Sequence, residues 1–310
     1  MPTSPPDISF PNLGINLNRV PMYLIGNDPD FSVIYFSWFP MNIYLYAVSI
    51  VIGITAAYLI GIWHVKNSGQ SVSAYTDLLL LGVPLAIVGL RIYYMVFNWD
   101  MFRGRNVLSA FFDIRDGGLA IFGGIIGAAI AAAIMGRKKN IPFALMADTG
   151  APSMLLGQVI GRFGNFFNRE AFGSPSDGVF AMQIRVDQAR YTTPELLENV
   201  VYVSGVPYFQ VHPTFIYEAA FNFVLMIALI LYRPRKTFDG EIVLMYFMGY
   251  GIIRFFVESL RTDQMIFMNT GLPLNQITSV LFAVVSGGLI IAGHLRARNI
   301  IPASTQGRKR

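Results

Sequence analysis

The stretch Ile141–Gly173, IPFALMADTGAPSMLLGQVIGRFGNFFNREAFG, decides how the rest of this chain is interpreted. Its first part, up to Gly161, is an apolar run long enough for a membrane helix, which needs about 20 residues. Charged side chains and amides follow where lipid headgroups would begin, among them Arg162, Glu170, Asn165 and Asn168. Ionisable groups near a membrane core are costly and usually functional, and Arg side chains bind phosphate well. The stretch therefore predicts a membrane helix that ends in a site for an amphipathic anion.

Composition places the whole chain in a membrane. Of its 310 residues, 54% are hydrophobic and 13% are charged, whereas a soluble domain carries about 25% charged residues. The chain has no cysteine, which excludes a disulfide, a thiolate metal site and a cysteine nucleophile. Any thiol in its chemistry must therefore arrive with a substrate. The first 40 residues lack a basic start followed by an apolar core, so we expect no cleavable signal peptide.

Apolar runs of helix length predict an all-α integral membrane protein with about seven transmembrane helices. The predicted spans are Met41–Trp63, Tyr75–Phe97, Gly117–Met135, Ile141–Gly161, Pro213–Tyr232, Glu241–Ser259 and Leu274–Gly293.

Basic residues predict the orientation of these helices, because they favour the cytoplasmic side. They gather in alternate connections and at the C-terminus, at Lys66, at residues 137–139, at residues 233–236 and at residues 296–310. The C-terminus is thus predicted to be cytoplasmic and the N-terminus outside. The predicted domains are an outward segment 1–40, helices one to four in 41–162, an outward cap 163–212, helices five to seven in 213–293, and a basic cytoplasmic tail 294–310.

A second polar group lies near the outer end of the sixth predicted helix. Arg254, Glu258 and Arg261 are spaced i, i+4 and i+7, which aligns them on one helix face. A structural ion pair between Arg254 and Glu258 would explain two of the three. The excess positive charge of the triad favours an anionic ligand instead.

Three further polar residues are possible site residues. Arg91 is equally consistent with binding a ligand and with anchoring its helix at the interface. Glu218 lies near the start of the fifth predicted helix, shortly after His212 and Pro213. His212 has a pKa suited to proton transfer, although a loop histidine usually has no such role. The glycines of Asp116–Gly127 favour close helix packing over a phosphate cradle.

Several site types lack a sequence signal. Neither a His pair nor clustered carboxylates suggest a metal, and we expect no metal and no cofactor. The chain has no nucleotide-binding loop and no serine-centred elbow, so an intrinsic hydrolase is disfavoured. Nothing indicates nucleic acid as a partner.

On these residues the chain resembles the prolipoprotein diacylglyceryl transferase family of bacterial membrane enzymes. The resemblance is carried by GRFGNFFNREAFG at Gly161–Gly173 and by four other places in the same order. These are the Tyr46 region, GLRIYY at Gly89–Tyr94, HPTFIYE at His212–Glu218 and GYGIIRFFVESLR at Gly249–Arg261. Together they span about residues 40 to 293 and agree with the seven helices and topology predicted above.

The resemblance implies a reaction and its partners. The diacylglyceryl group of phosphatidylglycerol moves to the lipobox cysteine thiol of a prolipoprotein, a thioether forms and glycerol phosphate leaves. It also implies a multi-pass protein of the bacterial plasma (inner) membrane, in contact with membrane lipid and with its active site toward the outer leaflet. Arg162 and Arg254 would bind the phosphate, preorganised by Glu170 and Glu258.

The resemblance also implies a phosphatidylglycerol site around these arginines. Asn165 and Asn168 would hold headgroup oxygens, and the remaining binding residues would be Gly173, Tyr46 and Arg261.

Phe122 departs from the family pattern, which commonly has His, sometimes Tyr, at this position. Phenylalanine cannot take or give a proton, so three interpretations stay open. Another group or solvent deprotonates the thiol, whose pKa of about 8.5 is close to ambient pH. Tyr46 or His212 serves instead. Or the chain has altered activity. We favour the first, because the other matched positions are intact.

Two alternatives to the transferase are kept. One is a catalytically altered homologue that binds lipid or signal peptide, which Phe122 keeps open. The other is a lipid or anion transporter. Transporters often show inverted repeats and helices broken at the midplane, whereas this chain shows no repeat and its polar residues gather toward the outer side.

Overall fold

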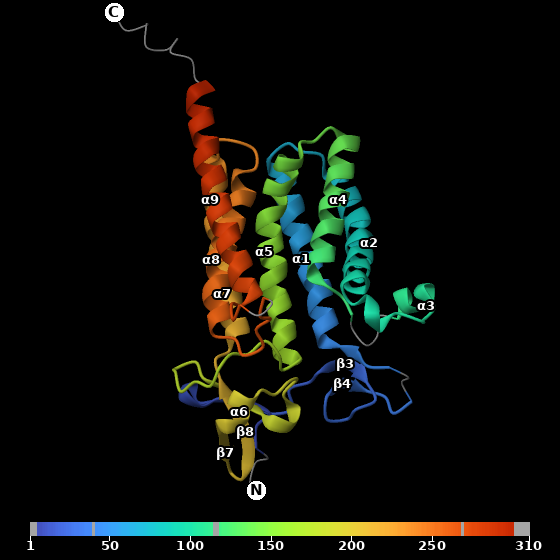
Figure 1. The fold of residues 1–310 in the computed structure, drawn as a ribbon, viewed down its shortest axis with the longest axis vertical. Helices are drawn as coiled ribbons and strands as arrows, with labels where there is room; N and C mark the ends of the chain where they lie inside the picture. Colours follow the sequence, from blue (N-terminus) through green and yellow to red (C-terminus); the bar gives the residue numbers. More distant parts are fainter. Residues whose placement is uncertain (1–4, 39–40, 114–117, 268–269, 301–310) are drawn as a thin grey trace, which may run out of the picture. The chain divides into compact units, whose positions relative to one another are not determined.

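The computed structural model describes residues 5–38, 41–113, 118–267 and 270–300 of the chain. It is mostly helical, with nine α-helices within these residues, and a helix overlaps each predicted span (Figure 1). The helices are α1 (Leu45–Asn67), α2 (Val72–Phe97), α3 (Val107–Phe112), α4 (Ile121–Lys139), α5 (Phe143–Phe167), α6 (Pro194–Glu198), α7 (Thr214–Tyr232), α8 (Glu241–Ser259) and α9 (Leu274–Ile300).

Six of these helices are long and apolar enough to cross a membrane, by length and composition: α1, α2, α4, α7, α8 and α9. The seventh predicted span, Ile141–Gly161, forms α5, which is long but is not among the six. Polar side chains explain the difference, because α5 buries Asp148, Thr149 and Ser153 within its length. The described residues thus support a multi-pass helical membrane protein with six apolar candidate spans.

An antiparallel five-stranded sheet and a mixed three-stranded sheet accompany the helices. The all-α prediction did not include them. Their strands are β1 (Ile8–Phe10), β2 (Ile15–Leu17), β3 (Tyr23–Gly26), β4 (Ser32–Tyr35), β5 (Ile43–Tyr44), β6 (Met182–Arg185), β7 (Val200–Val203) and β8 (Val206–Val211). The five-stranded sheet has the order β2-β1-β6-β8-β7, and the three-stranded sheet has the order β4-β3-β5. Most strands have only three or four residues, which is too short for a clear period-two pattern in the sequence.

The five-stranded sheet joins the predicted N-terminal segment to the predicted cap. Strand β1 pairs with β6 so that Ile8 lies opposite Ile184. One face of the sheet is apolar, and Ile8, Ile184 and Phe209 belong to a buried core that also includes Phe172 and Phe215. The cap therefore folds around a hydrophobic core of its own, in contact with the loop after α5 and the start of α7.

The chain divides into two compact units. The larger unit contains residues 1–57 and 151–310, and the smaller unit contains residues 58–150. In the larger unit α7, α8 and α9 run side by side, with α6, β7 and β8 gathered at one end of them (Figure 1). This end carries most of the predicted site residues.

Glycines bring α2 and α4 together in the smaller unit. A Cβ atom on Gly123 would run into the backbone carbonyl of Gly89, and one on Gly127 into that of Leu85. The two helix backbones therefore touch where Gly123 and Gly127 on α4 have no Cβ. This confirms the packing interpretation of the glycine-rich motif, whose first residues, Asp116 and Gly117, lie outside the described residues.

Candidate active site

Glu218 on α7 lies at the centre of a polar cluster and binds arginines from two other helices. Its Oε1 accepts a hydrogen bond from Nη2 of Arg162 on α5 at 2.5 Å. Its Oε2 accepts one from Nη1 of Arg254 on α8 at 2.9 Å. The Glu218 side chain is 1% exposed, and a buried carboxylate needs such partners. One carboxylate thus holds two guanidinium groups close together that would otherwise repel each other.

Arg254 has a second carboxylate partner on its own helix. Its Nη2 lies 2.7 Å from Oε2 of Glu258, at the i, i+4 spacing read from the sequence. Glu258 is also buried, and its Oε1 accepts a hydrogen bond from Asn275 on α9 at 2.9 Å. Arg254 is therefore balanced by two carboxylates.

Arg261 was predicted to add positive charge to the Arg254 face, and the structure changes that prediction. Arg261 follows the end of α8 and donates two hydrogen bonds to Asp263, at 2.8 and 2.6 Å. Asp263 therefore offsets its charge locally. Glu218 and Asp263 offset the excess positive charge that the triad alone suggested. The spacing on one helix could not predict these two partners.

Glu170 was predicted to orient an arginine, but the structure gives it another role. Its Oε1 accepts hydrogen bonds from the amide groups of Asn165 at 2.9 Å and Asn168 at 3.2 Å. Asn165 in turn accepts a hydrogen bond from Nη1 of Arg162 at 3.2 Å. Glu218 is the direct carboxylate partner of Arg162, and Glu170 acts on Arg162 through Asn165. An i, i+3 pattern on one helix could not reveal the contact that α7 supplies.

Gly173 and Arg261 meet at the end of the signature stretch. They form an isolated antiparallel bridge, and the adjacent Ser174 N–H donates to the Leu260 carbonyl at 2.7 Å. A Cβ on Gly173 would lie 2.5 Å from that carbonyl oxygen and 2.8 Å from Cγ2 of Thr214. Glycine is therefore required here by the close approach of the α8 terminus, and it brings two predicted site residues together.

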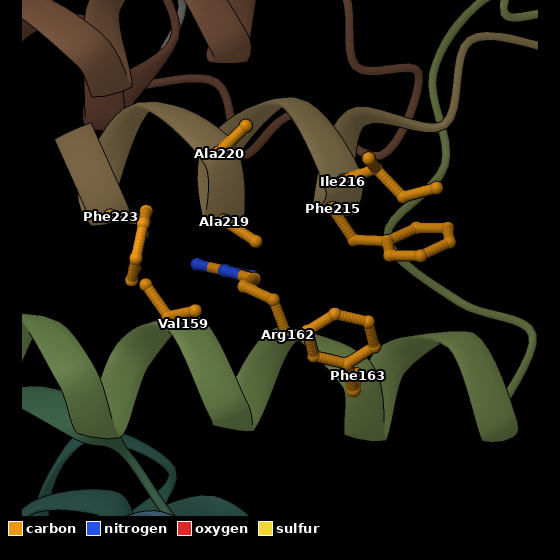
Figure 2. A pocket seen from close by; sticks show the side chains of 8 residues that line it. All are labelled: Val159, Arg162, Phe163, Phe215, Ile216, Ala219, Ala220 and Phe223. Atoms are coloured by element: carbon orange, nitrogen blue, oxygen red, sulfur yellow. The ribbon is translucent and has the colours of Figure 1, made fainter.

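An apolar cavity of about 220 Å³ lies beside Arg162, between α5 and α7. It is lined by Val159, Arg162, Phe163, Phe215, Ile216, Ala219, Ala220 and Phe223. Figure 2 shows Arg162 extending from α5 toward Ala219, with Phe163 and Phe215 to one side and Val159 and Phe223 to the other. The Arg162 side chain is 21% exposed. One cation thus borders a space that otherwise suits hydrocarbon.

Tyr46 and His212, the two suggested proton carriers, lie in different surroundings within the larger unit. The ring of Tyr46 packs on Gly164, where an added Cβ would come within 2.7 Å of it. Tyr46 is thus next to the helical turn that carries Arg162. His212 has its Nδ1 at 3.3 Å from the hydroxyl of Tyr217. Burial lowers the pKa of His212 below its ordinary value, which favours the neutral form of its ring.

Arg91 belongs to the smaller unit and binds backbone carbonyl groups there. The side chain donates to the carbonyls of Gly118 at 2.8 Å and Asp113 at 2.6 Å, and also to those of Ala110 and Phe111. Arg91 is 4% exposed, and its guanidinium lies 5.5 Å from the centre of the Phe102 ring. Arg91 thus organises the connection that contains α3, a role that neither interpretation from the sequence included, and both of those interpretations stay predictions.

Phe122 also belongs to the smaller unit, in the first turn of α4. It is 38% exposed, and its ring centre lies 6.0 Å from that of Tyr93. Phe122 therefore contacts another aromatic ring, and its side chain has no group that could carry a proton.

Two polar residues near Glu218 were missed by sequence reasoning. Tyr250 donates its hydroxyl to Oε1 of Glu218 at 3.3 Å, and it precedes Arg254 by four residues on α8. Asn222 follows Glu218 by four residues on α7 and donates to Gln158 of α5 at 3.3 Å. The i, i+4 spacing to a charged residue was the available signal in both cases.

No group of three or more His, Asp or Glu side chains that could hold a metal ion occurs within residues 5–38, 41–113, 118–267 and 270–300. Hydrogen bonds and ion pairs fix the guanidinium groups of Arg162 and Arg254 and use only part of their five N–H donors. The arrangement can therefore bind an anion by directed N–H groups and can stabilise negative charge that develops on it.

Comparisons with known proteins identify the family of the chain. A family model described as prolipoprotein diacylglyceryl transferase matches residues 33–292. A phosphatidylglycerol–prolipoprotein diacylglyceryl transferase of Finegoldia magna is 38% identical over 257 residues, which cover 83% of this chain and 92% of that protein. One of Bacillus cereus is 36% identical over 267 residues, covering 85% of this chain and 92% of the relative.

Proposed function

This chain belongs to the prolipoprotein diacylglyceryl transferase family, and from that premise we propose how its residues carry out the transfer. It is a membrane transferase whose substrates are phosphatidylglycerol and a prolipoprotein. The acceptor atom in our proposal is the thiol sulfur of the lipobox cysteine. The observation that carries the proposal is Glu218 holding Arg162 and Arg254 together beside an apolar cavity.

The reaction exchanges one bond to carbon for another. The thiolate sulfur attacks the glycerol carbon that carries the phosphate ester, and a carbon–sulfur bond forms as the carbon–oxygen bond breaks. The electron pair of that bond leaves on the phosphate oxygen, so glycerol phosphate departs. The thiol proton is lost before or during the attack. A phosphodiester with one negative charge thereby becomes a monoester that develops a second.

Arg162 and Arg254 stabilise this second charge. A guanidinium carries five N–H donors, and each of these two uses part of its set on carboxylate or amide partners. The other N–H groups are available to the phosphate oxygens. Because the donors are fixed before the charge develops, they lower the barrier without having to reorganise.

Glu218 makes the cluster selective as well as rigid. Arg162 and Arg254 together match the charges of Glu218 and Glu258, so the cluster does not attract anions through excess charge. Binding then depends on donor geometry, and stabilisation is greatest when the phosphate gains charge in the transition state. Glu170, Asn165 and Asn168 keep the Arg162 side of this arrangement in position.

The apolar cavity accounts for the lipid part of the substrate. Phe163, Phe215 and Phe223 provide a hydrocarbon surface next to Arg162, which matches the boundary between the phosphate and the acylated glycerol. The basic residues of the connections support an orientation that directs this end toward the outer leaflet of the bacterial plasma membrane. The predicted outward cap, residues 163–212, would then cover the site from outside.

The thiol proton needs no dedicated carrier at Phe122. A cysteine thiol has a pKa of about 8.5, so a few per cent is thiolate near neutral pH. His212 is a candidate acceptor, because burial favours the neutral form of its ring. Tyr46 lies beside the Arg162 turn, but a tyrosine hydroxyl with a pKa of about 10 keeps its proton near neutral pH. We favour deprotonation by solvent or by His212 over a loss of activity.

A transfer assay tests the proposal directly. Purified protein in lipid is given phosphatidylglycerol labelled in the diacylglycerol part and a peptide with a lipobox cysteine, and both labelled peptide and glycerol phosphate are measured. The proposal expects both products in equal amounts. Peptide binding without transfer would favour a silent homologue. Flux of labelled lipid or anion across proteoliposomes would favour a transporter, and family membership disfavours both alternatives.

A further inference from the structure

Arg169 lies inside the signature stretch but has no part in the phosphate cluster. Its side chain is completely buried, and its φ of 50° places the backbone in the left-handed region, which non-glycine residues adopt only when their surroundings hold them there. Its Nη2 donates to the carbonyl of Val20 at 2.6 Å, and its Nε donates to Oε1 of Gln188 at 3.1 Å. Arg169 therefore joins three distant parts of the chain.

The N-terminal partner of Arg169 is itself fixed by a carboxylate. Asp7 accepts a hydrogen bond from the Val20 N–H at 2.9 Å and another from the amide of Gln188 at 3.1 Å. The ring of Phe31 completes the surroundings, with its centre 5.3 Å from the Arg169 guanidinium carbon. Residues 5–31, here called the N-terminal brace, thus hold Arg169 from several sides. The brace precedes residues 33–292, which the family model matches.

Arg169 is joined to the phosphate cluster through its sequence neighbours. Its Nη1 donates at 3.2 Å to the carbonyl of Phe167, the last residue of α5. Asn168 and Glu170 flank it, and Ala171 beyond them has a φ of 56°. Two left-handed residues around Glu170 define the direction of its carboxylate, which holds Asn165. Asn165 in turn holds Arg162.

We propose that the N-terminal brace is a positioning element of the phosphatidylglycerol site and that Arg169 is the positioning residue that connects the two. The brace fixes Arg169, Arg169 fixes the loop of Glu170, and Glu170 fixes Arg162 through Asn165. This inference rests on the proposed function of the site. It assigns a role in the reaction to a segment outside the residues that the family model matches.

The variant Arg169→Gly separates this role from backbone strain, because glycine adopts the same φ without a Cβ. We expect kcat for transfer to fall about tenfold, since small displacements of transition-state donors lower rates by up to about 10²-fold. KM for phosphatidylglycerol changes by less. Asp7→Ala, which loosens the brace and removes the carboxylate 4.0 Å from Nη2 of Arg169, gives a smaller fall in the same parameter. The matched control is Arg185→Ala, whose arginine lies in the same cap and pairs with the exposed Asp187.

A double-mutant cycle distinguishes positioning from simple loss of stability. Each single variant, Arg169→Gly or Glu170→Gln, should lower kcat by more than about twofold relative to the wild type. If Arg169 acts through Glu170, adding Arg169→Gly to Glu170→Gln should lower kcat by less than about twofold further. Fully additive losses, or an unchanged kcat in both Arg169→Gly and Asp7→Ala, would overturn the inference.

Hydrogen exchange of the intact proteins supplies a readout that does not depend on activity. Arg169→Gly and Asp7→Ala should speed exchange in residues 162–173, while Arg185→Ala should not. If the wild type transfers normally but hydrogen exchange is unaltered in both variants, the positioning role of the brace is contradicted and the proposed function is not. Absence of transfer by the wild type contradicts the proposed function, and faster exchange would then still support the physical link.

Discussion

Arg162 in the larger unit and Arg91 in the smaller unit both lie within long helices, one or two residues after a glycine. Their surroundings differ. Arg91 is 4% exposed and donates to backbone carbonyls. Arg162 shares a buried carboxylate with Arg254 and borders an apolar cavity. Arg91 stabilises a loop by donating to its carbonyl groups. The shared carboxylate of Glu218 instead keeps two guanidinium groups close together, in a position where they can bind an anion. We infer that the identity of the partners separates a structural arginine from a functional one.

The largest effect is expected for Arg162→Ala. The change removes N–H donors that stabilise the charge of the leaving phosphate, so transfer should fall by about 10³-fold or more. The measurement is the rate of labelled diacylglyceryl transfer to a lipobox peptide, with thermal unfolding as a control for the fold. A variant that kept most of its activity would contradict the phosphate assignment.

Glu218→Gln should have the next largest effect. The amide cannot accept from both arginines as a carboxylate does, so Arg162 and Arg254 lose their common anchor, although the cluster becomes more positive. We expect kcat to fall about 10²-fold while phosphatidylglycerol binding is kept or strengthened. Steady-state kinetics over a range of lipid concentrations separate the two parameters. Weaker phosphatidylglycerol binding with an unchanged kcat would mean that Glu218 contributes to substrate binding and not to stabilising the transition state.

Arg91→Ala should affect stability far more than chemistry. Its loss leaves one buried and several partly buried carbonyl groups without this donor, which costs roughly 2–4 kcal/mol of unfolding free energy. Activity per folded molecule should stay within about threefold, because the hydrogen bonds of Arg91 to Ala110, Asp113 and Gly118 join it to backbone groups of its own unit. A normal unfolding temperature combined with a large loss of kcat would break the contrast between the two arginines.

Phe122→His should have the smallest effect and sharpens the same contrast. If the thiol is deprotonated elsewhere, a new imidazole changes the rate by less than about twofold, whereas a general base in use contributes about 10²–10⁴-fold. The pH dependence of the rate is measured alongside. A rise of 10²-fold or more would show that this position is a base site that the chain lacks.

The sequence predicted the helices better than the sheets. Long apolar runs placed α7, α8 and the start of α9 within a residue, because a membrane helix leaves a strong signal in about 20 residues. The strands of the cap are short, and the pairing of Ile8 with Ile184 joins residues far apart in the chain. Only the folded chain brings such residues together.

The same limit applies to the site. Spacing on one helix predicted the Arg254–Glu258 pair, which the structure contains at 2.7 Å. It could not predict that Glu218 from another helix joins Arg162 to Arg254, nor that Glu170 binds amides rather than an arginine. Contacts between helices depend on packing, which a single sequence does not record.

The most direct test of the account is a structure of the protein with phosphatidylglycerol bound in a lipid environment. We predict that the lipid phosphate lies within hydrogen-bonding distance of both Arg162 and Arg254, with acyl carbon atoms against Phe163 and Phe223. A phosphate bound elsewhere, in contact with neither arginine, would contradict the central claim.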